Sequence, residues 1–220
     1  MSQQRYSAWA RLIGFGFRLL YNELAWLYDP VSWFVSLGWW RRWQQTALAY
    51  LPTGGSVLEV GFGPGHLLSD LAVAGHLPFG LDLSRHMLRL AQRRLRRRGM
   101  AANLVRGRAG ALPFAARAFD AVVLTFPTPF VYDPAWIRSL ERVLKPGARL
   151  VVVEGSFFAR RTLSARFLEW LYRITGQRGP VPDLPGLLSQ VGLQARRKSV
   201  AVGSSTVRLI VADKPETAAA

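Results

Sequence analysis

A glycine-rich turn between two apolar segments is the feature of this sequence that most restricts its fold. Residues 57–66 read Val-Leu-Glu-Val-Gly-Phe-Gly-Pro-Gly-His, and residues 80–84 read Gly-Leu-Asp-Leu-Ser. This order is typical of a buried strand, a turn, a helix and a second strand that ends in a carboxylate. The glycines allow a ligand to approach backbone N–H groups closely, and the carboxylate can accept hydrogen bonds from both hydroxyls of a ribose. The segment therefore predicts a site for an adenosine-type cofactor.

Strands that alternate with helices predict the rest of the architecture. We expect an α/β fold with a Rossmann-like, doubly wound, mainly parallel sheet, an antiparallel C-terminal hairpin and an N-terminal helical cap. The expected strands are 56–60, 77–83, 103–107, 120–125, 149–154, 194–202 and 206–212, and the expected helices are 65–74, 85–98, 134–144, 163–175 and 184–191.

Three parts of the chain are expected to differ in role. An aromatic helical cap or lid covers 1–51, the cofactor-binding domain covers 52–215, and 216–220 form a tail. Asp29-Pro30 is expected to divide the cap into two helices.

Composition excludes several kinds of chemistry. The chain of 220 residues has no cysteine and three histidines, so disulfides and a thiolate nucleophile are excluded and we expect no metal site. The formal net charge of +16, carried almost entirely by arginine, is compatible with nucleic acid or an anionic membrane as a partner, or with an arginine-biased, solvated surface, which we favour. No secretory signal is visible, and the apolar run 30–40 is too short to span a bilayer, so we expect a cytoplasmic protein.

The spacing of the glycines helps to distinguish between cofactors. A nicotinamide site favours Gly-x-Gly-x-x-Gly, whereas this chain has Gly61-x-Gly63-x-Gly65, and His66 stands where the third glycine of that pattern would be. The negative charge of Glu59 is unfavourable beside a pyrophosphate. It suits a cofactor that carries an amino-acid cation and a sulfonium.

Over roughly residues 57–154 the chain resembles the class I S-adenosylmethionine-dependent methyltransferases, with a methyltransferase type 11 domain. Segments that resemble the family's motifs follow in the expected order at 57–65, Asp82, 111–114, 118–123 and 142–147.

The resemblance implies roles for individual residues. The turn 61–65, with Gly61, Phe62, Gly63 and Gly65, lies under the methionine part of the cofactor, and Glu59 helps to orient its ammonium. Asp82 binds the ribose hydroxyls, Leu83 packs on the adenine, the backbone at Ala109 and Gly110 reads the adenine edge, and Thr125 and Phe126 face the transferring methyl. Arg108 departs from the family, which often has an acid there, and arginine cannot accept a hydrogen bond from the adenine amino group.

The N-terminal segment is similar to that of the ubiquinone/menaquinone-biosynthesis C-methyltransferases. The resemblance rests on 28–30 (Tyr-Asp-Pro), 36–38 (Ser-Leu-Gly), Arg41 and Trp43, whereas Ser32, Trp40 and the segment 125–130 depart from those enzymes. It implies that Tyr28 folds over the cofactor as part of a lid.

The acceptor is expected to be a small, partly apolar molecule, for which a quinol or phenol is one possibility. Weak candidates for a general base are Tyr28, Tyr132, Asp133 and Glu154, and a helix N-cap explains Asp133 equally well. Residues 125–128 lack the Asn-Pro-Pro-aromatic motif of enzymes that methylate an exocyclic base amine.

Two other functions remain open. Arginines over 85–98, at 160–161 and at 196–198 would suit an RNA methyltransferase or RNA-binding protein, although no aromatic residues are interleaved with them. A non-catalytic cofactor-binding protein is the second.

Most tryptophans of 5–51 are expected to pack on the sheet, yet six tryptophans flanked by arginine would also suit an anionic membrane surface. The sequence predicts neither the acceptor atom nor the oligomeric state.

Overall fold

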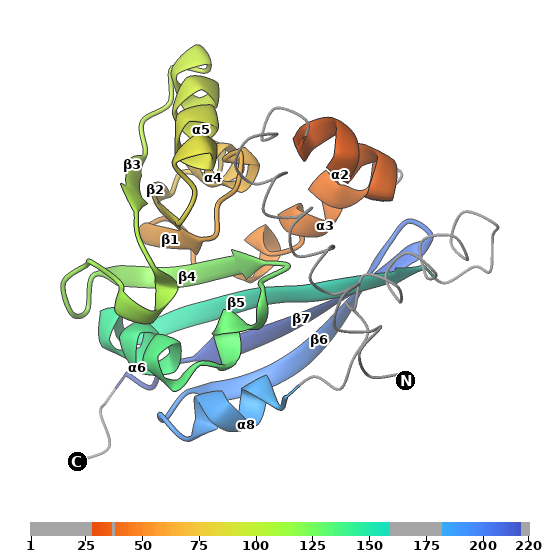
Figure 1. Cartoon of the computed structure of the whole chain (residues 1–220). Coiled ribbons are helices and arrows are strands. Elements are labelled where there is room, and N and C mark those ends of the chain that lie inside the picture. Colours follow the sequence, from red (N-terminus) through yellow and green to blue (C-terminus); the bar gives the residue numbers. More distant parts are fainter. Residues whose placement is uncertain (1–27, 37, 159–181, 217–220) are drawn as a thin grey trace, which may run out of the picture.

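A seven-stranded sheet organises the computed structural model, which describes residues 28–36, 38–158 and 182–216 (Figure 1). The strand order is β3-β2-β1-β4-β5-β7-β6. Neighbouring strands from β3 to β5 are parallel, and β7 runs antiparallel between β5 and β6. The strands are β1 (Ser56–Val60), β2 (Leu77–Asp82), β3 (Asn103–Arg106), β4 (Phe119–Thr125), β5 (Leu144–Phe158), β6 (Gln194–Val202) and β7 (Ser205–Asp213). The predicted fold class is therefore confirmed, with the antiparallel hairpin at one edge.

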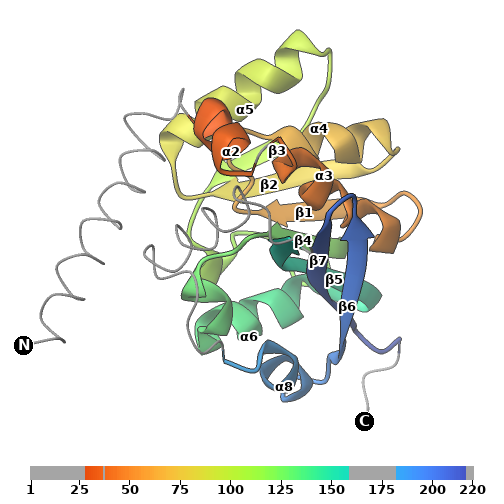
Figure 2. The ribbon, with the colours of Figure 1, turned by 90° about the vertical axis from the view of Figure 1, so that its right-hand side faces the viewer.

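Helices cover both faces of the sheet (Figure 2). One hydrophobic core lies under α6 and α8, a second lies under α3 and α4, and a smaller third lies between α4 and α5. The helices are α2 (Tyr28–Ser36), α3 (Trp40–Gln45), α4 (His66–Val73), α5 (Arg85–Arg97), α6 (Pro134–Val143) and α8 (Leu184–Ser189), with short 3₁₀ helices η2 (Leu48–Tyr50), η3 (Ala109–Ala111) and η4 (Pro129–Tyr132).

The alternation of side chains along β1 determines which face carries the polar residue of the glycine motif. Val57 packs in the core under α3 and α4, whereas Leu58 and Val60 pack in the core under α6. Glu59 therefore lies on the same face as Val57, because successive strand residues point to opposite faces. On the neighbouring strand β4, Thr125 lies on this same face.

The helix α3 is part of the sheet's core rather than a separate layer. The Trp43 side chain is fully buried, and its indole N–H donates to the Ser205 hydroxyl on β7 at 2.8 Å. Burying an indole whose N–H is satisfied contributes on the order of 3 kcal/mol to stability. The N-terminal segment is thus fixed to the C-terminal hairpin.

One expectation about element bounds was wrong. The strand expected at 149–154 is longer: β5 begins at Leu144, which pairs with Phe119, and a register irregularity follows before Arg149 pairs with Ala121. Asp29-Pro30 lies in the first turn of α2, a position that tolerates proline, and the residues before α2, which the expected division of the cap also concerns, lie outside the described residues. The break between α2 and α3 is near Gly38, which has φ +81°.

The other strands and helices with predicted bounds agree with the sequence predictions to within one or two residues, whereas no bounds were predicted for α2, α3 and the 3₁₀ helices. The helix expected at 163–175 lies outside the described residues. Within the described ranges, no helix combines the length and apolar character that a membrane span requires.

Candidate functional site

The glycine turn follows β1 at the carboxyl edge of the parallel strands. Gly61, Gly63 and Gly65 have φ of +76°, +52° and +77°, a left-handed conformation that only glycine adopts readily. A Cβ added at Gly61 or Gly63 would have no atom of the described residues within 4 Å, so open space lies against this backbone there. A Cβ at Gly65 would come within 2.7 Å of the Ala91 Cβ, so this glycine lets α4 and α5 pack closely. The first two glycines therefore border a space that a ligand can fill.

Asp82, at the end of β2, is buried beside this space. Its Oδ2 accepts a hydrogen bond from the Gly63 amide at 3.0 Å, and its Oδ1 accepts from the Ser84 amide at 2.8 Å. Burial raises the pKa of the carboxyl, and the amides of Ser84 and Gly63 oppose that shift. Each carboxylate oxygen keeps a further lone pair for a ligand hydroxyl. Asp82 thus positions the glycine turn and can still bind a ribose.

Glu59 is a fully buried acid, and the backbone of Leu68 is the one hydrogen-bonding group of the described residues near it that lowers its pKa. It is 1% exposed, and neither carboxyl oxygen has a hydrogen-bond partner among the described residues. Burial raises the pKa of Glu59 well above its usual range, and the negative charges of Asp82 and Asp70 raise it further. An unpartnered buried carboxyl is destabilising unless a ligand compensates it. A bound ammonium would provide that compensation.

Two polar side chains of α3 lie on the same face of the sheet as Glu59. Arg41 donates through Nη2 to Asp70 at 2.7 Å, while its Nη1 is shielded from solvent and has no partner among the described residues. The Gln44 Nε2 donates to the Thr125 hydroxyl at 3.1 Å, and its buried Oε1 also has no partner there. The Arg41 charge lowers the pKa of Glu59, against the effect of burial. The two α3 residues thus add one free donor and one free acceptor.

Neither Arg41 nor Gln44 was predicted from the sequence to have a role in the site. Their spacing of three residues on a helix was the available signal, because residues i and i+3 share a helix face. The aromatic residues around them drew attention to packing instead.

The residues expected around the adenine lie near the end of β2. Leu83 is 59% exposed, so its side chain is free to form an apolar contact, and Ala109 and Gly110 lie in η3. The Phe62 side chain points away, since it is buried in a core with Leu68 and α5. Only its backbone can therefore contribute to the site.

The tip of β4 has an unusual backbone. Phe126 has φ +51°, which is strained for a residue with a side chain and costs on the order of 1–2 kcal/mol. Its amide donates to the Val153 carbonyl at 2.8 Å, and its ring stacks on Trp40 with centroids 4.2 Å apart. These contacts hold the strained residue in place. They form an aromatic surface next to Thr125.

The candidate general bases differ in their surroundings. Burial and the nearby Glu154 charge raise the pKa of Tyr132, which disfavours its phenolate near neutral pH. Glu154 lies at an irregularity between the paired residues Val153 and Gly155, where a β-bulge redirects a side chain. Tyr28 is the first residue of α2, and its side chain lies outside the described part of the structure.

Asp133 is the N-cap of α6, and its carboxylate accepts from the Ala135 amide at 2.8 Å. We expect Asp133→Ala to lower the free energy of unfolding by about 1 kcal/mol because the cap is lost. Asp133→Asn should retain most of the stability. Denaturant titration of the three proteins measures the effect, and a loss of methyl transfer in both variants at unchanged stability would show a catalytic role instead.

Asp29 ties α2 to the elements that follow the glycine turn. It accepts from His66 at 2.9 Å and from Arg94 at 2.6 Å, and Arg94 also donates to the Pro64 carbonyl at 2.8 Å. Burial opposes the shift, but His66 and Arg94 lower the pKa of Asp29 to about 2. The position of the glycine turn is therefore linked to that of α2.

The pairing of His66 with Asp29 predicts that the stability of the fold depends on pH. Burial lowers the pKa of His66 below 6.5 in the folded chain, although Asp29 opposes this shift. The unfolded chain then binds more protons, so stability is complete above pH 6.5 and falls as the pH drops through the folded pKa. Melting temperatures across this range should fall less for His66→Gln than for the wild type. His76→Gln, at the other end of α4, is the control, and an equal fall in His66→Gln would contradict the assignment.

Comparisons with known proteins agree with the fold and the glycine motif. A family model described as "Methyltransferase domain" matches residues 57–147. Demethylmenaquinone methyltransferase of Lactiplantibacillus plantarum is 36% identical over 146 residues, which are 62% of this chain and 61% of that protein. The ubiquinone/menaquinone biosynthesis C-methyltransferase UbiE of Syntrophotalea carbinolica is 32% identical over 177 residues, 78% of this chain and 72% of that protein.

A solved structure shares the fold at lower identity. Phosphoethanolamine N-methyltransferase 2 of Haemonchus contortus, in complex with S-adenosylmethionine, has a TM-score of 0.61 and 17% identity, over 81% of this chain and 53% of that one. The sheet, the open glycine turn and the buried acids define a cofactor-binding protein with a Rossmann-like fold. With these relatives, the chain belongs to the family of S-adenosylmethionine-dependent methyltransferases. By their names, the Lactiplantibacillus plantarum relative is a methyltransferase for demethylmenaquinone, and the Syntrophotalea carbinolica relative is a C-methyltransferase of ubiquinone/menaquinone biosynthesis.

Proposed function

We propose that this chain binds S-adenosylmethionine and transfers its methyl group to a small, partly apolar acceptor, with quinols and phenols as the first class to test. One observation carries the proposal. Buried polar atoms of Glu59, Arg41 and Gln44 lack partners within the described residues. An open glycine turn borders the same edge of the sheet. An amino-acid group, with one ammonium and one carboxylate, has the charges that these atoms require.

The proposal gives each part of the cofactor a set of residues. Glu59 accepts from the ammonium, and Arg41 donates to the carboxylate. Asp82 accepts from the ribose hydroxyls, as in other nucleotide sites at this position. The role of Leu83 and the backbone of 109–110 at the adenine stays a prediction from the family resemblance, as does that of Tyr28 as a lid.

The sulfonium supplies an activated methyl group, so the chain's own task is to position the acceptor and to exclude water. The stacked rings of Phe126 and Trp40 offer an apolar, planar surface beside Thr125. An aromatic acceptor could pack against such a surface. We keep Glu154 as a candidate for accepting a proton from the acceptor, whereas the raised pKa of Tyr132 disfavours that role.

The names of the relatives support a quinone-type acceptor, and two observations limit that inference. The alignment spans 61% of the Lactiplantibacillus plantarum protein, and the segment 125–130 departs from the quinone enzymes. The RNA alternative gains no support from the matched family or relatives. We also propose, as the sequence suggested, that 1–51 form a cap over a cofactor domain of 52–215, with a tail at 216–220, and that the protein works in the cytoplasm.

Calorimetric titration with S-adenosylmethionine, followed by transfer of a labelled methyl group to a panel of short-chain quinols and phenols, tests the proposal. We expect micromolar-range binding and label in an extractable acceptor. Absence of binding by a folded protein would overturn the cofactor assignment. Binding with no transfer to any acceptor of the panel would overturn the acceptor class.

A further inference from the structure

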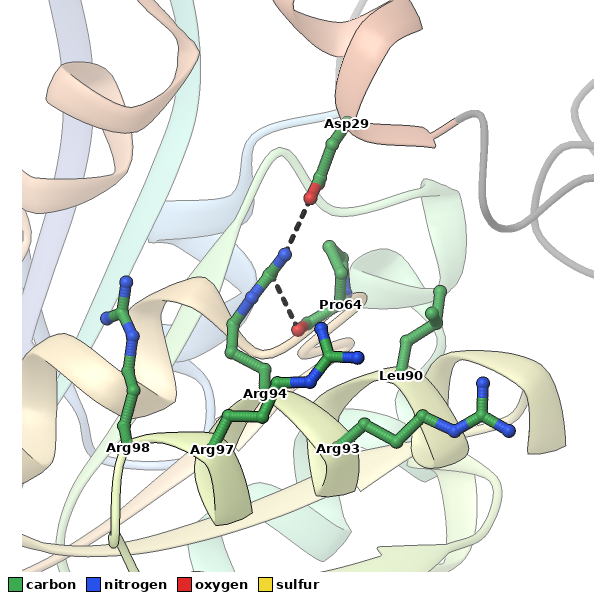
Figure 3. Close-up of a pocket in the computed structure, with 7 residues that line it drawn as sticks. All are labelled: Asp29, Pro64, Leu90, Arg93, Arg94, Arg97 and Arg98. Atoms are coloured by element: carbon green, nitrogen blue, oxygen red, sulfur yellow. Dashed lines mark hydrogen bonds and ion pairs between the residues drawn. The ribbon is translucent and has the colours of Figure 1, made fainter.

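A pocket of about 380 Å³ lies between α2 and α5, behind the glycine turn (Figure 3). Pro64 of the glycine turn lines it, whereas the proposed cofactor-binding side chains of Glu59, Asp82 and Arg41 do not. It is lined by Asp29, Pro64, Leu90, Arg93, Arg94, Arg97 and Arg98. Figure 3 shows the arginines on the α5 side and Asp29 on the opposite wall.

The charge of this pocket is unbalanced. Arg94 is paired with Asp29, whereas Arg93, Arg97 and Arg98 form no ion pair within the described ranges. The helix α5 has no acidic residue in its sequence. Like charges one turn apart on a helix repel each other, so an arrangement of this kind is stabilised by an anion. Guanidinium groups bind phosphate oxygens in pairs, which makes a phosphate the favoured anion.

The helix that supplies Asp29 also presents apolar side chains to solvent. Trp33 and Phe34 are 65% and 63% exposed, and Val31 is 37% exposed. Large apolar side chains are seldom exposed together without a partner. Trp and Phe beside arginines are typical of surfaces that lie in the headgroup region of an anionic bilayer. A soluble phosphate compound would explain the arginines but not the exposed rings.

We propose that α2 and the pocket of α5 form a docking surface for an anionic phospholipid bilayer, with a lipid phosphate between Arg93 and Arg97 and with Trp33 and Phe34 in the headgroup region. Because Pro64 belongs both to the pocket lining and to the glycine turn, docking brings the cofactor site to the membrane. This goes beyond the proposed function, since vesicle binding requires no methyl transfer. Only the inference that docking helps a lipophilic acceptor to reach the site rests on the proposed function.

Vesicle co-sedimentation of the full chain tests the proposal. We expect the protein to sediment with vesicles of equal parts phosphatidylcholine and phosphatidylglycerol but not with phosphatidylcholine alone. The double variant Arg93→Gln/Arg97→Gln should bind the anionic vesicles about thirtyfold more weakly, since each arginine at such a surface contributes about one kcal/mol. The double variant Arg89→Gln/Arg96→Gln makes the same charge change outside the pocket lining, and should lose less than about threefold.

A further double variant separates the contribution of the apolar side chains to vesicle binding from that of the arginine charges. Trp33→Ser/Phe34→Ser keeps all arginines and should also bind anionic vesicles about tenfold more weakly. Unchanged binding of this variant would overturn the proposed insertion. Equal losses in the two arginine double variants would overturn the pocket, because a diffuse charge effect would then suffice.

Soluble probes distinguish a lipid phosphate from a free phosphate or a nucleic acid as the anion that the arginines bind. Inorganic phosphate could raise the melting temperature of the wild type but not of Arg93→Gln/Arg97→Gln. If the wild type then also fails to bind vesicles, the partner of the pocket is a free anion and not a bilayer. If single-stranded RNA binds tightly and displaces the protein from anionic vesicles, the partner of this surface is nucleic acid and not a bilayer. Thermal melting of every variant confirms folding without cofactor. Cofactor titration of the wild type then separates failure of this proposal from failure of the proposed function.

Discussion

Asp82→Ala is expected to weaken the binding of S-adenosylmethionine by at least about a hundredfold, because hydrogen bonds to a charged group contribute about 1.5–3 kcal/mol each and two ribose hydroxyls would lose them. The loss has a second cause. The Asp82 Oδ2 also accepts from the Gly63 amide, so the glycine turn loses a fixed position. Calorimetric titration with S-adenosylmethionine measures the combined effect.

A matched variant separates binding from general damage. Asp120 lies near the start of β4, at the opposite edge of the sheet, where its carboxylate accepts from the Ser56 amide and Lys145. Asp120→Ala should lower stability but leave cofactor affinity within about threefold of wild type, as expected for distant sites. Wild-type affinity in a folded Asp82→Ala protein would refute the ribose assignment.

The second large effect concerns Glu59, whose proton should leave when the cofactor binds. Its pKa is raised above 4.5 in the free protein by burial, and a bound ammonium would lower it. Affinity should therefore rise with pH across the interval between the bound and the free pKa, and become constant above it. Titrations in buffers of different ionisation enthalpy measure the released proton. Glu59→Gln should release none and bind about ten- to a hundredfold more weakly.

The same substitution should affect stability in the opposite direction. A folded pKa above the unfolded value means that stability is complete at low pH and is lost as the pH rises through the folded pKa. In the absence of cofactor, Glu59→Gln should therefore melt higher than the wild type in alkaline buffer, and the difference should shrink in acid. An equal difference at both pH values would show that Glu59 is not the titrating group.

The strands and the glycine turn could be predicted from the sequence because their signals are local. Ser56–Val60 and Gln194–Val202 were predicted residue for residue, since buried strands and alternating strands have clear patterns. The start of β5 could not be predicted this way. Leu144 joins the strand only through its pairing with Phe119, which depends on the sheet rather than on the neighbours of Leu144 in sequence.

The site was predictable in part for the same reason. Asp82 and the glycines carry a motif, whereas Arg41 and Gln44 reach the site through the packing of α3 on the sheet. The role of Asp29 was missed because its partners, His66 and Arg94, are far away in sequence. Conversely, Phe62 belongs to the motif, yet burial beside Leu68 removes its side chain from the site.

The bond between Trp43 and Ser205 joins residues 162 positions apart in the chain. During synthesis, the chain must grow by these 162 residues beyond Trp43 before the residue that accepts its hydrogen bond is made. Long sequence separations of this kind slow folding, because the chain must close a large loop before the contact can form. Until β7 has been made, the Trp43 indole on α3 therefore lacks the hydrogen-bond partner that it has in the folded chain.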